Sequence, residues 1–166
     1  MRQFVHHQHY QIRNPCEGQV LTLGDVSVTL KVTGSQTNGA FAIFESTVPP
    51  HFAGSPAHCH PHATATFYIV SGVLAFTLAE ETVMVRQGGI VTVPPSLLHK
   101  FWNPTAMPAT YLAYLSPAGF EQYFVELAAI MVAEEQWPPQ DLRQVAALGA
   151  KYELYPPATA ADILTG

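Results

Sequence analysis

The sequence predicts an all-β fold, and three observations support this prediction. Only 11% of the 166 residues are charged, whereas about a quarter is usual, and proline (14 residues) and glycine (11 residues) are plentiful. Short β-prone segments recur at regular spacing over residues 26–115, which is typical of a sandwich or barrel. Helical periodicity begins only after Ser116. We therefore expect one β unit followed by a short helical segment.

The β segments are predicted from alternating apolar residues and from turn residues. Residues 26–32 alternate apolar and polar side chains, and the turn at Asn38-Gly39 leads into an apolar segment over residues 40–48, so we expect a hairpin. Two further hairpins are expected to turn at Ser71-Gly72 and at Gln87-Gly88-Gly89. The remaining predicted strands are 66–70, 73–78, 82–86, 90–93, 98–103 and 110–115.

The helical part is predicted from end signals. Ser116 and Pro117 suit an N-cap and a first helical turn, and apolar residues then recur at helical spacing. A second helix is expected after Pro138-Pro139, ending near Gly149. We thus expect a single domain over residues 1–166, with the β unit at about 18–115, helices at about 117–150 and an extended tail over 151–166.

Charge and composition favour a small-molecule partner. The formal net charge is −5, and the seven lysines and arginines are spread thinly, so neither nucleic acid nor anionic lipid is an expected partner. The longest apolar run, residues 127–133, is too short to cross a bilayer. Residues 1–11 lack the apolar stretch of a secretory signal, and two cysteines make no disulfide framework. We expect a cytoplasmic protein.

The residues that point to chemistry are His58-Cys59-His60 and, about forty positions later, His99. In an extended segment alternate side chains share a face, so His58 and His60 can grip one ion while Cys59 points away. A third imidazole from another strand can complete one face of a coordination sphere and leave positions open for a small molecule. The sequence therefore predicts a metal site at His58, His60 and His99.

Two stretches carry a family resemblance. The first runs from Gly54 through His58 and His60 to Gly72, and the second contains Gly88, Pro94, Ser96, His99 and Asn103, with Ser96 at a usual glycine. Both resemble the conserved motifs of the cupin superfamily, and the C-terminal part resembles small bacterial cupins similar to quercetin dioxygenase. The resemblance implies a jelly-roll β-barrel, commonly a homodimer, that holds a divalent metal.

The same resemblance implies two histidines and a glutamate from the first motif and a histidine from the second. Counting back from Gly72 puts that glutamate at Ala65, and no acidic residue lies between Cys59 and Leu78. Some dioxygenases of the superfamily, similar to the cysteine and acetylacetone enzymes, use three histidines alone. Such a site suits iron, nickel, zinc, manganese or copper, and its higher charge favours an anionic or enolate-forming substrate.

Several other residues are left with two interpretations. His62 is either a further ligand and the one nameable base or a surface histidine, and Glu45 is either a substitute carboxylate or a surface charge. The apolar residues Phe67, Ile69 and Phe101 either line a ligand cavity or belong to the core. The N-terminal His6, His7 and His9 either bind metal adventitiously or lie in a flexible segment.

The function expected from these residues is a metal-dependent oxygenase acting on a small aromatic or enolizable compound. The alternatives are a non-catalytic cupin that binds a small molecule and a metal-dependent isomerase or lyase. Three histidines that keep a fold without holding a metal remain the simplest competing interpretation.

Overall fold

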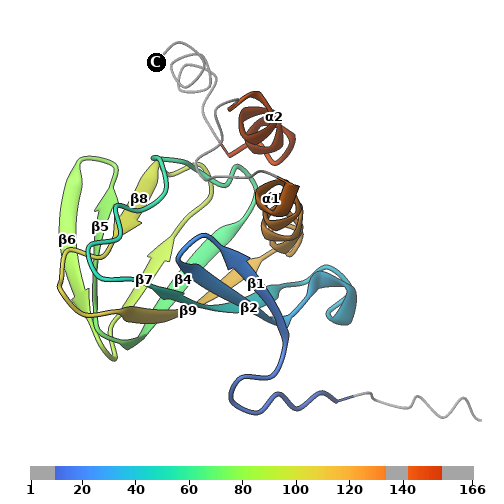
Figure 1. Cartoon of the computed structure of the whole chain (residues 1–166), viewed down its shortest axis with the longest axis horizontal. Helices are drawn as coiled ribbons and strands as arrows, with labels where there is room; N and C mark the ends of the chain where they lie inside the picture. The colour runs from blue at the N-terminus through green and yellow to red at the C-terminus, as the bar shows by residue number, and fades with distance from the viewer. Residues whose placement is uncertain (1–9, 134–141, 155–166) are drawn as a thin grey trace, which may run out of the picture.

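Two antiparallel β-sheets form the body of the molecule in a computed structural model that describes residues 10–133 and 142–154 (Figure 1). The larger sheet has the strand order β1-β2-β3-β9-β4-β7, and the smaller has the order β6-β5-β8. The strands of the larger sheet are β1 (Gln19–Leu23), β2 (Val26–Val32), β3 (Ala42–Val48), β4 (Thr64–Ser71), β7 (Ile90–Val93) and β9 (Ala109–Ser116). Those of the smaller sheet are β5 (Val73–Leu78), β6 (Glu81–Arg86) and β8 (His99–Trp102).

The predicted all-β fold is confirmed: the strands form a jelly-roll sandwich rather than a closed barrel. The inward faces of both sheets carry apolar side chains, and Phe76, Ile69 and Leu74 are fully buried between them. Alternation of buried and partly exposed residues along β3 and β9 reflects the period-two geometry of strands with one core face.

One predicted hairpin is confirmed and two are wrong. Strands β2 and β3 pair across the turn that contains Asn38 and Gly39, both at positive φ, and the 3₁₀ helix η1 (Gly34–Gln36) lengthens the connection. At Ser71-Gly72 and at 87–89, by contrast, the chain passes from one sheet to the other. Ile69 exchanges backbone hydrogen bonds with Gly88 and Gly89, so the two crossings lie side by side. Turn residues predict that the chain bends, but they do not say which strands pair.

The helical segment also differs from the prediction at its boundaries. Ser116 still pairs with Thr64 as the last residue of β9, so α1 (Glu121–Ala133) begins four residues after Pro117. The second helix, α2 (Arg143–Lys151), contains Gly149 instead of ending at it. Pro138-Pro139, the predicted start of α2, and His6, His7 and His9 lie outside the described residues. Strand β1 was not predicted from the sequence.

Helix α1 lies along one open side of the sandwich beside β1, and α2 packs on α1 (Figure 1). The Phe124 ring meets Phe44 of β3 edge-on at 4.8 Å between centroids. Tyr123 and Leu148 form a second small core between the two helices. In the part of the chain that the structure describes, no helix has the length and apolar character needed to cross a membrane.

Asn103, predicted as part of the second motif, holds two loops together. Its buried amide nitrogen donates to the carbonyl oxygens of Pro49 (2.9 Å) and Met107 (2.7 Å), and its oxygen accepts from Thr105. We expect Asn103→Ala to lower the free energy of unfolding by about 2 kcal/mol, because buried carbonyls lose their donors. Urea denaturation measures this loss. Asn103→Asp should be no better, since a carboxylate cannot donate to Pro49, and wild-type stability in Asn103→Asp would contradict the argument.

Candidate metal centre

The three predicted histidines come together because backbone pairing joins the loop before β4 to the start of β8. The His58 N–H donates to the His99 carbonyl at 2.9 Å, and the His99 N–H donates back to the His58 carbonyl at 2.8 Å. The His60 carbonyl accepts from the Ser96 N–H at 2.9 Å. These bonds place one nitrogen of each imidazole within 4.8 Å of those of the other two.

The hydrogen bonds of the rings leave nitrogen lone pairs free for a metal. A backbone carbonyl only accepts, so Nδ1 of His99 donates to Leu97 at 2.9 Å and Nδ1 of His58 donates to Pro56 at 3.0 Å. In the neutral tautomer this leaves Nε2 of each of these two rings unprotonated. Nε2 of His99 is buried without a hydrogen-bond partner among the described residues. Carbonyl-anchored imidazoles of this kind are the usual ligands of transition metals.

Burial keeps these imidazoles neutral. Desolvation, assisted by the neighbouring His99, lowers the pKa of His58 to about 4. Desolvation, with the nearby His58 and His99, lowers the pKa of His60 to about 3. The pKa of His99 is likewise lowered, mainly by desolvation. Near neutral pH the cluster therefore offers unprotonated nitrogens, which is the form that binds a metal, and the residues present fit a divalent ion.

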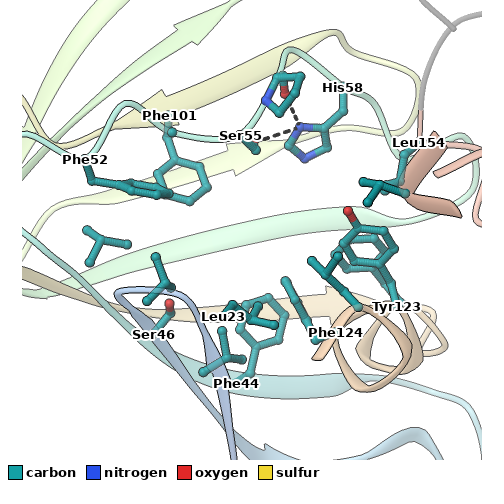
Figure 2. A pocket seen from close by; sticks show the side chains of 18 of the residues that line it. Leu23, Phe44, Ser46, Phe52, Ser55, His58, Phe101, Tyr123, Phe124 and Leu154 are labelled. Carbon is teal, nitrogen blue, oxygen red and sulfur yellow. Dashed lines mark hydrogen bonds between the residues drawn. The ribbon is translucent and has the colours of Figure 1, made fainter. Parts of the chain in front are cut away.

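A cavity of about 400 Å³ lies between the sheets beside the histidines (Figure 2). Helix α1 closes one side of it, where the Phe120 ring meets the His60 ring at 4.5 Å between centroids. Leu154, after α2, also lines the cavity, and its carbonyl accepts from the Cys59 N–H at 2.8 Å. The lining is mostly aliphatic and aromatic, and it contains no Asp, Glu, Lys or Arg among the described residues. The site can thus exclude water around a small apolar molecule.

Some of the other candidate residues line the cavity and the rest lie away from the site. Phe67 and Phe101 line the cavity, whereas Ile69 is fully buried in the core and does not. The His62 side chain is 79% exposed and lies 3.4 Å from Glu153, outside the three-histidine cluster. Glu45 lies between the inward-facing Phe44 and Ser46 and so points to the outer face of its sheet.

The structure shows the surroundings of two residues that differ from the usual motifs, Ser96 and Ala65. Ser96 has a φ of +64°, in the left-handed region that glycine adopts readily, which accounts for the usual glycine at this position. Ala65 is fully buried in β4 between Val93 and Leu115 of the neighbouring strands. Its methyl group offers no ligand atom, and no carboxylate joins the cluster among the described residues.

Two polar residues in the cavity wall were not predicted from the sequence. Ser46 and Tyr111, on the adjacent strands β3 and β9, both line it. The only available signal was parity: Ser46 stands at an inward position between Phe44 and Val48, where a strand with an apolar face would carry another apolar residue.

The chain is similar to one protein family and to several solved structures. The family model described as "Cupin domain" matches residues 44–114. No curated protein matches in sequence. Among solved structures, KdgF from Halomonas sp. aligns with a TM-score of 0.60 at 12% identity, over 69% of this chain and 99% of that one.

Two other solved structures give the same result. An RmlC-like cupin from Shewanella frigidimarina aligns with a TM-score of 0.58 at 16% identity, over 69% of this chain and 96% of its own. The polyketide cyclase RemF from Streptomyces resistomycificus aligns with a TM-score of 0.57 at 15% identity, over 65% and 80%. Likeness at this identity concerns the fold. The chain therefore has the cupin jelly-roll fold, with a match to the cupin domain over residues 44–114.

Proposed function

We propose that this protein is a metal-dependent oxygenase that acts on a small aromatic or enolizable compound. The observation that carries the proposal is the convergence of three neutral imidazoles, two of which, His58 and His60, line a mostly apolar cavity. His58, His60 and His99 would hold the ion. A divalent metal bound there would polarise an oxygen of the substrate and, if redox-active, support its reaction with dioxygen.

The remaining residues supply binding and shielding. Phe67, Phe101 and Phe120 would pack against an aromatic substrate and keep water from it. We take Ala65 to stand where related cupins carry a glutamate, so this site has no carboxylate base. His62 is exposed and directed to Glu153, so it does not replace that base. Substrates that ionise easily, such as acidic enols, suit the site best.

Metal analysis tests the first half of the proposal. Protein purified without a histidine tag should contain a divalent metal, or should bind one added iron(II) or nickel per chain after chelation. Elemental analysis and calorimetry measure this. If no metal is retained and none binds on addition, the oxygenase proposal fails and a metal-free binding protein takes its place.

Oxygen consumption tests the second half. With metal bound, flavonol or 1,3-diketone substrates should be consumed together with dioxygen, as an oxygen electrode records. Turnover without oxygen uptake would support the alternative of a metal-dependent isomerase or lyase. Tight substrate binding without turnover would support the non-catalytic binding protein, for which the absence of a charged residue in the described lining also argues.

A further inference from the structure

A buried hydroxyl that makes no regular hydrogen bond lies on the wall of the cavity that faces the histidines. Ser46 of β3 is 1% exposed, and its Oγ makes no hydrogen bond of regular geometry among the described residues, although the Tyr111 hydroxyl lies close enough to interact with it. The hydroxyl points into the cavity from the larger sheet, while His58 lies on the far wall beside β8 (Figure 2). Because an unpaired buried hydroxyl is costly, such a group in a cavity calls for a partner.

Tyr111 accompanies it on the neighbouring strand. The two residues stand opposite each other in the β3–β9 register, and both line the cavity. Burial raises the pKa of Tyr111 to about 12, an effect that hydrogen bonding with the nearby Ser46 hydroxyl partly opposes. Tyr111 is therefore a neutral phenol near neutral pH, and this pair presents hydroxyl groups that can both donate and accept.

The rest of the lining limits what the pair can recognise. Without a charged side chain among the described lining residues, this end of the cavity would leave a carboxylate or phosphate without a counter-charge. A cavity of about 400 Å³ accommodates a small organic molecule of one to a few rings. A hydroxyl or carbonyl oxygen on an otherwise apolar ligand would satisfy Ser46 at no such cost.

We infer that Ser46 and Tyr111 form a second recognition site, which binds an uncharged oxygen at the end of the ligand opposite the three imidazoles. The substrate class is then a largely apolar compound with an ionisable oxygen for the histidine end and an uncharged oxygen for the hydroxyl end. The assignment of the first oxygen rests on the proposed function, whereas that of the second depends only on the cavity.

Two matched probes test the site in metal-free protein: 4,4′-dihydroxybiphenyl and 4-hydroxybiphenyl. In wild-type protein the diol should bind about fivefold more tightly than the mono-ol, because one further hydrogen bond is made. In Ser46→Ala the ratio of the two dissociation constants should fall to the twofold that symmetry alone gives the diol. Calorimetry measures both constants, and Ser27→Ala, at an exposed position of β2, should keep the wild-type ratio.

Thermal unfolding separates recognition from a structural role. The melting temperature of Ser46→Ala should stay close to that of wild type, since the variant loses no hydrogen bond of regular geometry. A wild-type ratio near two, an unchanged ratio in Ser46→Ala or a clear drop in its melting temperature would each overturn the inference. Because no metal is present, these outcomes are independent of the metal and oxygen measurements that decide the proposed function.

Discussion

His99→Ala should weaken metal binding by at least about 100-fold. Loss of a residue that merely orients a ligand costs about 10- to 100-fold, and here one of three ligands is removed with no carboxylate to compensate. Calorimetric titration of chelated, untagged protein with nickel or zinc measures the affinity. At one metal concentration, metal should also raise the melting temperature of the wild type by more than that of the variant, because stabilisation of the native state grows with affinity.

The chain supplies a matched control for this variant. His62→Ala removes an imidazole from the same loop, but that side chain is 79% exposed and lies beside Glu153. It should bind metal as the wild type does. Without metal, His99→Ala should still fold, since the variant loses only the Nδ1 bond to the Leu97 carbonyl, and Nε2 of His99 has no partner to lose among the described residues. Equal metal affinity in His99→Ala and wild type would show that the ligand set is wrong.

The strands were predictable where one face of a segment is buried. Period two along Val26–Val32 and the apolar run into Val48 gave the β2–β3 pair correctly. The crossings near Gly72 and Gly88 were not predictable from local sequence, because they depend on which sheet accepts the next strand. Gly72 shows this dependence: at φ +78°, a Cβ added there would lie 2.7 Å from the Pro108 carbonyl, which is a tertiary contact.

The candidate site was predictable only in part for a similar reason. The spacing of His58, His60 and His99 shows that these residues can meet, and the structure brings them together. The sequence gives no signal for the position of His62, because Glu153 lies ninety-one residues away along the chain. Nor does it reveal Ser46, whose importance comes from its burial on the cavity wall without a regular hydrogen bond.

The closure of that cavity depends on a buried carboxylate at the start of α1. Glu121 is 3% exposed, and its two oxygens accept from the Gly34 and Gly119 N–H groups, each at 2.7 Å. Gly34 belongs to the connection between β2 and β3, so this residue ties the helix to the larger sheet. Acceptance of N–H groups by a carboxylate at a helix N-terminus is strongly favourable.

Glu121→Ala should therefore lower the free energy of unfolding by roughly 2 to 4 kcal/mol, because the buried Gly34 N–H is left without an acceptor. Glu121→Gln should recover only part of this loss, since its amide NH₂ would face a donor. Urea denaturation of metal-free protein measures both. Glu126→Ala is the control: this carboxylate on the same helix accepts from Lys151 and from the Tyr152 hydroxyl but from no buried backbone N–H of the described residues, so its removal should cost less.

The same variant should also loosen the cavity. Phe120 directly precedes Glu121 and Phe124 follows it within one turn, and Phe120 packs against His60. With the start of α1 released, Glu121→Ala should bind 4,4′-dihydroxybiphenyl more weakly than Glu126→Ala does, even at temperatures where both variants are fully folded. Equal binding by the two variants would mean that Glu121 stabilises the fold without holding the helix over the cavity. Weaker binding in Glu121→Ala alone would make the carboxylate a positioning residue, acting on the ligand through the helix that covers it.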